Sequence, residues 1–130
     1  DYLTSIEDEL KLKEITYIFS QCLPGGGLKD GALALIENGT SVLTLITQAN
    51  TASIMGSNLS EACARGGIPV VFSMSNLSLK SDAYSLPEID SLVAPLISII
   101  PLQLLAFYSA LERGCNIDKP RNLAKSVTVE

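Results

Sequence analysis

Three charged residues near the start of the chain have the types and spacing of a proton-transfer site. Glu7 and Glu14 lie seven residues apart, two turns of an α-helix, so both carboxylates would project from one face. Lys11 lies between them, at helical spacing from each. Carboxylates in such a position can accept and return protons when a substrate is within hydrogen-bond reach. The same spacing is also typical of a solvated, salt-bridged helix face, which is the commoner interpretation on spacing alone.

A second candidate is Lys125, which stands among uncharged residues near the end of the chain. It follows Leu123 and Ala124 and precedes a Ser-Val-Thr-Val segment. If this tail packs inward, desolvation disfavours the ammonium form and lowers the pKa of the lysine. A neutral amine can then attack a carbonyl carbon. A lysine near a terminus is more often a solvated surface residue, so both interpretations stay open.

Residue types that are absent or rare narrow the chemistry further. The chain contains no histidine, the commonest acid or base at neutral pH and the commonest metal ligand. Its three cysteines, Cys22, Cys63 and Cys115, are odd in number and far apart. They match neither a disulfide framework nor a metal-ligand spacing. We therefore expect free thiols in a reducing, cytoplasmic compartment, with no metal and no cofactor.

The composition is that of a single globular domain. Of the 130 residues, 47% are hydrophobic and 18% charged, enough apolar material for a buried core. Nine basic residues against 14 acidic ones give a net charge of −5, and no basic cluster occurs. The electrostatic support for nucleic-acid binding is therefore missing.

Alternating strand and helix patterns predict an α/β fold with a parallel sheet flanked by helices. A strand, a helix and a second strand in succession form a right-handed crossover, which makes the two strands parallel. Ligands of such sheets gather at the carboxyl ends of the strands. The expected strands are 42–47, 68–73 and 83–86, and the expected helices are 4–19, 52–65 and 92–111.

The long apolar segment 92–111 has two possible interpretations. It contains 20 residues without a charge, which is long enough to span a membrane. Pro95 and Pro101 interrupt it, and no basic cluster flanks either end. We therefore expect a helix buried against the sheet, kinked or restarted at Pro101, and no membrane association.

Local signals mark the ends of two other segments. Thr4 and Glu7 have the spacing of a capping box, which would begin the first helix. The run Pro24-Gly25-Gly26-Gly27 breaks the chain and predicts a loop that leads into a short buried helix before residue 36. This run fits neither of the common glycine-rich phosphate-binding patterns.

Four stretches of sequence are distinctive enough to compare with known families. They are ELKLKEITY at 9–17, PGGGLKDGALALI at 24–36, PLQLLA at 101–106 and DKPRNLAKSVTVE at 118–130. Together they closely resemble the C-terminal part of the glutamine–fructose-6-phosphate aminotransferase (isomerising) family. The resemblance spans essentially the whole chain, and its C-terminal string is highly specific.

The resemblance implies a domain organisation. Members of the family carry a glutaminase domain followed by two sugar isomerase (SIS) domains, each with a flavodoxin-like parallel sheet. Residues 1–130 resemble the second SIS domain from its first long helix onward, so its first strand is expected to lie outside this sequence and to leave a sheet edge open. Residues 118–130 correspond to an active-site tail. The implied partners are the first SIS domain, the glutaminase domain and a second subunit in a homodimer.

The resemblance also implies a reaction and a role for each candidate residue. The family makes glucosamine 6-phosphate from fructose 6-phosphate and ammonia derived from glutamine. Glu14 corresponds to the glutamate that moves a proton between C1 and C2 of the sugar. Lys125 corresponds to the lysine that acts at the C2 carbonyl and is implicated in a Schiff base, and Glu7 and Lys11 to supporting residues.

One position departs from the family pattern. Asp30 stands where the family has the histidine that opens the sugar ring, since GELKHGP there is GGLKDGA here. An aspartate with an ordinary pKa of ~3.9 is a poor proton donor compared with an imidazole of ~6.5. The ring could open spontaneously, burial could raise the pKa of Asp30, or the chain could have left catalysis and serve as a noncatalytic sugar-phosphate-binding module.

Overall fold

The sheet of this domain has three parallel strands in sequence order. The computed structural model describes residues 1–79 and 84–124, with β1 (Ser41–Ile46), β2 (Ile68–Met74) and β3 (Tyr84–Leu86). β2 lies in the middle and pairs in parallel with both neighbours. The α/β class with a parallel sheet is therefore confirmed, and each predicted strand is present within one residue of its predicted ends in the described part of the chain.

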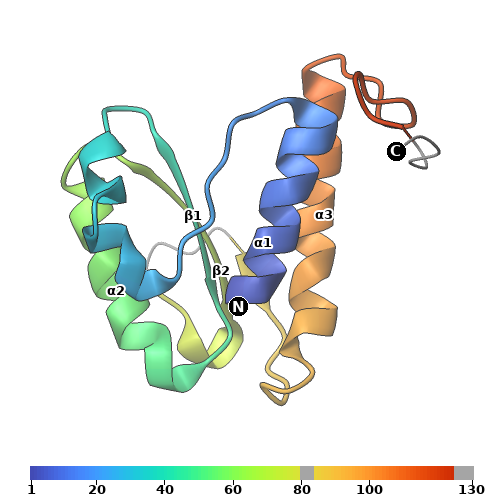
Figure 1. Ribbon diagram of the computed structural model, residues 1–130. Coiled ribbons are helices and arrows are strands. Elements are labelled where there is room, and N and C mark those ends of the chain that lie inside the picture. Colours follow the sequence, from blue (N-terminus) through green and yellow to red (C-terminus); the bar gives the residue numbers. More distant parts are fainter. Residues whose placement is uncertain (80–83, 125–130) are drawn as a thin grey trace, which may run out of the picture.

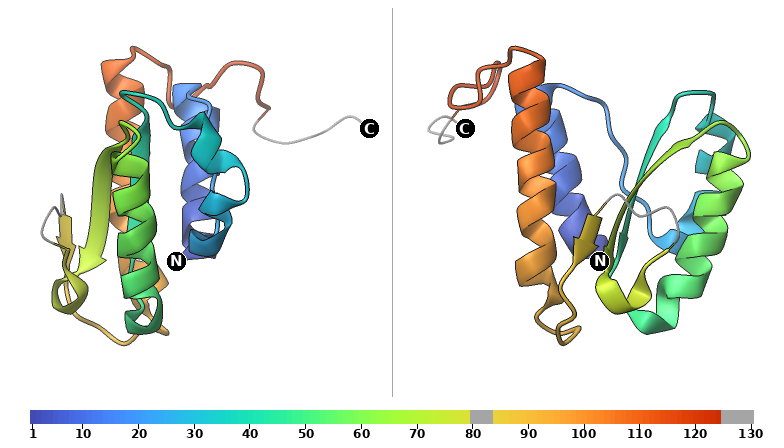
Figure 2. Two further views of the ribbon diagram at one scale, coloured as in Figure 1. Left: turned by 90° about the vertical axis from the view of Figure 1, so that its left-hand side faces the viewer. Right: turned by 180° about the vertical axis from the view of Figure 1, so that it is seen from behind.

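Helices cover both faces of this sheet. Figure 1 shows α2 (Ala49–Cys63) on one side and the pair α1 (Tyr2–Lys11) and α3 (Ala94–Glu112) on the other. Figure 2 shows α1 and α3 running side by side in the same direction, and the two helices are in contact. The β1–α2–β2 unit is the predicted crossover, because β1 and β2 are parallel neighbours joined by a helix.

The core divides into two layers because successive strand residues point to opposite faces. On the α3 side, Leu45 and Phe72 pack with Leu86 and with Leu102 of α3. On the α2 side, their chain neighbours Ile46 and Val71 pack with Leu59 of α2. Burial on both faces explains why the strands read as continuous apolar runs.

One side of α3 is buried against the rest of the domain, and the opposite side is exposed. It is long and apolar enough to cross a membrane by length and composition, yet Leu102 lies fully buried against the sheet. Pro101 lies inside α3, which continues on both sides of it without a restart. The inner side is a row of residues four apart, while Leu96 and Ile100 on the outer side are 71% and 50% exposed. The inner row is Ala94, Ser98, Leu102, Ala106 and Ala110.

The predicted beginning of the first helix is wrong. α1 begins at Tyr2 after Asp1, no side chain caps it, and Thr4 is buried within it. The Asp1 carboxylate instead accepts hydrogen bonds from the backbone N–H (3.0 Å) and the hydroxyl of Thr47. The start of α1 is thereby tied to the residue that follows β1, a contact between positions 46 residues apart.

The predicted short buried helix after the glycine run is also wrong. The segment forms two 3₁₀ helices, Gly25–Lys29 and Ala32–Leu35, without a buried residue. Gly25 lies so close to the Met55 side chain that an added Cβ would overlap its sulfur, and the Asn58 amide donates to the Gly25 carbonyl. A larger residue at this position would require the Met55 side chain to move.

Both outer edges of the sheet, at β1 and at β3, lack a partner strand among residues 1–79 and 84–124. An open edge is therefore not specific to a missing first strand, and the strand expected before α1 stays a prediction.

Candidate active site

The structure brings Glu7, Lys11 and Glu14 together on one face of the first helical segment. The Lys11 ammonium donates a hydrogen bond of 2.9 Å to Glu14 Oε2 and lies 3.5 Å from Glu7 Oε1. The three side chains are 45%, 36% and 30% exposed in chain order. They therefore remain accessible to a ligand.

The central ammonium of this group is electrostatically stabilised. The hydrogen bond to Glu14 raises the pKa of Lys11 above its ordinary value, partial burial opposes that shift, and the charges of Glu14 and Glu7 add to it. Lys11 is consequently a cation shared by two carboxylates, and it holds the Glu14 carboxylate in a defined orientation.

Glu14 lies in a π-helical turn, which the sequence reasoning missed. The turn, Leu12–Thr16, directly follows α1. The Thr16 hydroxyl donates to the Leu12 carbonyl and accepts from the Ile18 N–H at 3.1 Å. Tyr17 then ends the turn in the left-handed region, with φ of 60°. Single π-turns are frequent at functional sites. The sequence feature that could have indicated this turn is Thr16, whose hydroxyl can donate to the carbonyl four residues earlier.

Asp30 does not join this group. It is exposed at the end of the 3₁₀ helix Gly25–Lys29, which packs against α2 and lies across the sheet from α1 (Figure 1). An ion pair of 2.6 Å between Lys29 and Glu61 of α2 holds the helix there. Any catalytic role for Asp30 therefore acts at some place other than the Glu14 carboxylate of the same chain.

Lys125 and the residues after it lie outside the described residues, so its predicted partly desolvated position stays a prediction. The tail before it is described. The Arg121 N–H donates to the Tyr17 hydroxyl at 2.8 Å, and the Arg121 guanidinium lies 4.1 Å from the centre of the Tyr17 ring. The described tail therefore reaches the turn that carries Glu14.

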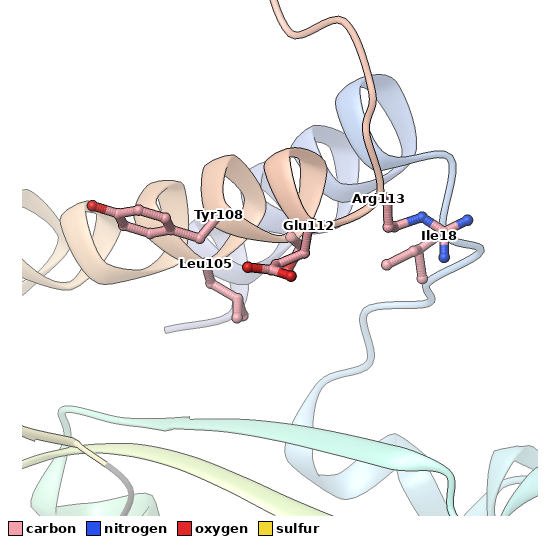
Figure 3. Close-up of a pocket in the computed structure, with 6 residues that line it drawn as sticks. Ile18, Leu105, Tyr108, Glu112 and Arg113 are labelled. Carbon is pink, nitrogen blue, oxygen red and sulfur yellow. The ribbon is translucent and has the colours of Figure 1, made fainter.

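Neither of two surface cavities contains the charged group of α1. A cavity of about 380 Å³ lies beside α3, where Figure 3 shows Leu105 pointing toward the strands and Arg113 near Ile18. A second, of about 490 Å³, lies at the carboxyl ends of β1 and β2 and includes Thr47 and Asn76. The Glu7, Lys11 and Glu14 side chains lie outside both cavities and are partly exposed to solvent.

Cys22, Cys63 and Cys115 are half-buried free thiols. Burial raises the pKa of Cys22 to about 11, and the charges of Glu9 and Asp8 contribute. Such a thiol is protonated at neutral pH and is a weak nucleophile. Within residues 1–79 and 84–124, no group of three or more cysteine, aspartate or glutamate side chains could hold a metal ion.

Asp8 is a buried carboxyl that the sequence reasoning also missed. It is 3% exposed, and its Oδ1 has no hydrogen-bond partner among the described residues. Burial raises the pKa of Asp8 to about 6, because the charged form is poorly solvated there.

This burial predicts that Asp8→Asn stabilises the protein at alkaline pH. A raised folded-state pKa contributes stability that is complete below the unfolded value near ~3.8 and is lost as the pH rises through about 6. The neutral amide avoids that loss, so we expect a gain of about 1–2 kcal/mol at pH 8 and little gain at pH 4. Urea unfolding at both pH values measures it, with Asp118→Asn, an exposed position, as the control. An equal pH dependence in Asp8→Asn and the parent would contradict this assignment.

Comparison with known proteins identifies relatives of the whole chain. No family model matches it. Glutamine–fructose-6-phosphate aminotransferases (isomerising) of Halalkalibacterium halodurans, Bacillus licheniformis and Shouchella clausii are 51%, 52% and 50% identical to it over all 130 residues. The chain is related over its full length to part of these aminotransferases. It spans 22% of the length of each of these three.

Solved structures agree with this relationship. The C-terminal domain of the glucosamine-fructose-6-phosphate aminotransferase from Francisella tularensis superposes with a TM-score of 0.84 at 32% identity, covering 91% of this chain and 34% of that one. A glucosamine-6-phosphate deaminase from Thermotoga maritima has a TM-score of 0.75 at 22% identity, covering 97% of this chain and 37% of that one, which shows the fold alone. The resemblance to the aminotransferase family that the sequence predicted is thereby confirmed, and so is the SIS-type α/β fold.

Proposed function

We propose that this chain is the C-terminal part of the isomerase region of a glutamine–fructose-6-phosphate aminotransferase. The whole enzyme would make glucosamine 6-phosphate from fructose 6-phosphate and ammonia derived from glutamine. The observation that carries the proposal is the Lys11 to Glu14 hydrogen bond of 2.9 Å on an accessible face, in a chain 51% identical along its whole length to such an enzyme.

The chemistry assigned to Glu14 is proton transfer on the open-chain sugar. Its carboxylate accepts the proton from C1 and returns it to C2, which converts the ketose skeleton into an aldose skeleton. The Lys11 ammonium orients the carboxylate, and Glu7 holds Lys11 from the other side. The positive charge beside the reacting oxygens also stabilises negative charge that develops as the C1 proton leaves.

The chemistry assigned to Lys125 is carbonyl activation. Its amine attacks C2 of the open-chain ketose, and the C2 oxygen leaves as water to give an imine. Ammonia then adds to this imine and expels the lysine amine, and the resulting ammonia imine at C2 draws electrons from the C1–H bond. When the proton is returned to C2, the ammonia nitrogen remains as the amino group of the product.

Other components of the reaction lie beyond this chain. The sugar phosphate would bind to the first SIS domain, and a glutaminase domain would supply the ammonia. We further propose a cytoplasmic homodimer, in which Asp30 faces the active site of the neighbouring subunit. Its exposed position on the α2 side, away from Glu14, supports that arrangement.

The test uses the full-length protein that contains this chain. With fructose 6-phosphate and glutamine it is expected to produce glucosamine 6-phosphate, and with fructose 6-phosphate alone to produce glucose 6-phosphate; both products are measured by chromatography. Binding of the sugar phosphate without either product would instead identify a noncatalytic binding module.

Asp30→His tests whether ring opening is the slow step. The imidazole restores a donor with a pKa near ~6.5, so turnover of fructose 6-phosphate is expected to rise about tenfold or more. Glu37→His, at another exposed position after the 3₁₀ helices, is the control and should leave turnover unchanged. An unchanged rate in Asp30→His would remove this position from the mechanism.

A further inference from the structure

The end of α3 is bonded to the turn that carries Glu14. Arg113, the residue after α3, donates a hydrogen bond of 2.9 Å from its Nε to the Thr16 carbonyl. Thr16 is fully buried and is the last residue of the π-turn Leu12–Thr16. A carbonyl at the end of a helical segment has no partner within that segment, and a hydrogen bond from a guanidinium is one of the stronger bonds that it can accept. The bond therefore fixes the end of this turn to α3.

The backbone of Arg113 is itself fixed by the way α3 ends. Gly114 follows it with φ of 66° and donates its N–H to the carbonyl three residues earlier, at 2.9 Å. The Cys115 N–H donates to the Ala110 carbonyl, also at 2.9 Å. These two bonds around a left-handed glycine form a Schellman motif. The same motif places the Cys115 sulfur 3.8 Å from the Thr16 carbonyl oxygen, so two side chains from the end of α3 contact one atom of the turn.

The turn also has bonds of its own that connect its end to Glu14. The Thr16 hydroxyl donates to the Leu12 carbonyl and accepts from the Ile18 N–H at 3.1 Å. Glu14 lies inside the turn closed by these bonds, two residues before Thr16. Its carboxylate accepts the 2.9 Å hydrogen bond from Lys11. Lys11 belongs to the same helical segment, so it orients the carboxylate relative to that segment, whereas the bond from α3 fixes the segment relative to the rest of the domain.

We propose that Arg113 is a positioning residue that acts through the Thr16 carbonyl to place the Glu14 carboxylate against the sugar. The inference rests on the proposed function, in which Glu14 moves a proton between C1 and C2. A base must lie within hydrogen-bond reach of the proton that it removes, and a misplacement of about 1 Å can cost about 10²-fold in rate. Loss of the bond from Arg113 would leave the end of the turn free to shift, and the base would shift with it.

The experiment removes the guanidinium from the full-length enzyme and measures isomerisation of fructose 6-phosphate to glucose 6-phosphate. Arg113→Met keeps the aliphatic part of the side chain and lacks the donor. Its kcat, divided by the fraction of folded protein that circular dichroism gives, is expected to fall about tenfold, with KM changed less than about threefold. Arg113→Lys restores a cationic donor, and its kcat should return to within about threefold of the parent value.

A deuterium isotope effect identifies the step that slows. With fructose 6-phosphate deuterated at C1, the isotope effect on kcat should be at least as large in Arg113→Met as in the parent, because a displaced Glu14 slows removal of the C1 proton. A smaller isotope effect together with a lower kcat would mean that another step has become slow. That result would contradict the positioning role.

Arg65→Met is the matched control. Like Arg113, Arg65 is an exposed arginine just beyond the end of a helix, in this case α2. Its guanidinium donates a hydrogen bond of 2.8 Å to the Glu61 carbonyl, and α2 lies on the opposite face of the sheet from α1 (Figure 1). The kcat of Arg65→Met should equal that of the parent. An equal loss in both variants would show that the effect is not specific to the turn that carries Glu14, and it would overturn the inference.

The outcomes distinguish this inference from the function on which it rests. A parent enzyme that does not isomerise fructose 6-phosphate overturns the proposed function. A parent that isomerises it, together with a parental kcat per folded protein in Arg113→Met, overturns the positioning role alone. A loss that Arg113→Lys does not recover, or one that appears mainly in KM, also overturns that role. If Arg113→Met does not fold, Arg113→Ala is judged by the same criteria.

Discussion

Glu14→Gln in the full-length protein is expected to lower turnover of fructose 6-phosphate by about 10²–10⁴-fold. Glutamine has nearly the same shape, and its amide oxygen can still accept the 2.9 Å hydrogen bond from Lys11. The amide cannot accept a proton from carbon, so the chemical step alone is removed. KM should therefore change little.

Incorporation of solvent deuterium at C2 of the product is the measurement that isolates this step. In deuterated water the parent should place deuterium at C2 during turnover, because the proton on Glu14 exchanges with solvent between its removal from C1 and its return to C2. Glu14→Gln should not. Glu88→Gln, at an exposed carboxylate on the chain after β3, should behave as the parent. Retention of more than about a tenth of the activity in Glu14→Gln would exclude this residue as the base.

Glu7 lies on the same helix face as Glu14 and has a weaker contact with Lys11. It lies 3.5 Å from Lys11 and is the more exposed of the two carboxylates, so it contributes through the orientation of Lys11. We therefore expect a supporting role for Glu7 and a direct role for Glu14, which accepts the shorter hydrogen bond from Lys11.

The sheet could be predicted from sequence because its signals are local. Val42 to Ile46 and Val70 to Phe72 are largely apolar runs that each begin three residues after a glycine, and their side chains alternate between two buried layers. Strand, helix and strand then follow from periodicity, and parallel pairing from the crossover. Predicted and observed strand ends differ by one residue at most where the chain is described.

The inner side of α1 could not be predicted in this way. The apolar residues Ile6 and Leu10 are 39% and 44% exposed, while Thr4 and Asp8 are buried. α1 packs against α3, whose buried residues are largely alanine and serine, and the buried side chains of α1 are the small and polar Thr4 and Asp8. The inner side of this helix is thus decided by a partner that lies about 90 residues later in the sequence.

The π-turn after α1 has a similar long-range origin. Periodicity predicted one helix from residue 4 to residue 19, but the α-helix ends at Lys11. The Thr16 carbonyl bonds Arg113, 97 residues away, and Arg121 contacts Tyr17 from 104 residues away. The sequence spacing did place Glu7, Lys11 and Glu14 correctly, because Lys11 still reaches Glu14 across the turn.

Glu14 and Asp30 lie on segments that contact different helices. Glu14 is fixed by a turn that α3 and the tail both contact, whereas Asp30 is fixed to α2 across the sheet. Asp30 and Glu14 therefore lie on opposite sides of the sheet in this chain (Figure 1).

Lys125→Arg is expected to abolish borohydride trapping of the imine between this residue and C2 of fructose 6-phosphate. It should also lower turnover of fructose 6-phosphate by about 10²-fold or more. Arginine keeps a positive charge on a long side chain but does not lose its proton in proteins, so it cannot attack a carbonyl. If Lys125 acts as a nucleophile, Lys125→Arg loses turnover; if it acts through its charge alone, Lys125→Arg keeps turnover. Lys119→Arg, the same exchange six residues earlier in the exposed tail, is the matched control.

Chemical rescue tests whether a free amine can replace the Lys125 side chain. In Lys125→Ala supplied with glutamine, added methylamine can form the C2 imine from solution with loss of water. Ammonia then displaces the methylamine, and Glu14 remains to move the proton. Turnover should rise with methylamine concentration in this variant and not in Glu14→Gln. Parental turnover in Lys125→Arg would show that Lys125 acts through its charge alone, and the imine step would then be removed from the mechanism while the role of Glu14 would stand.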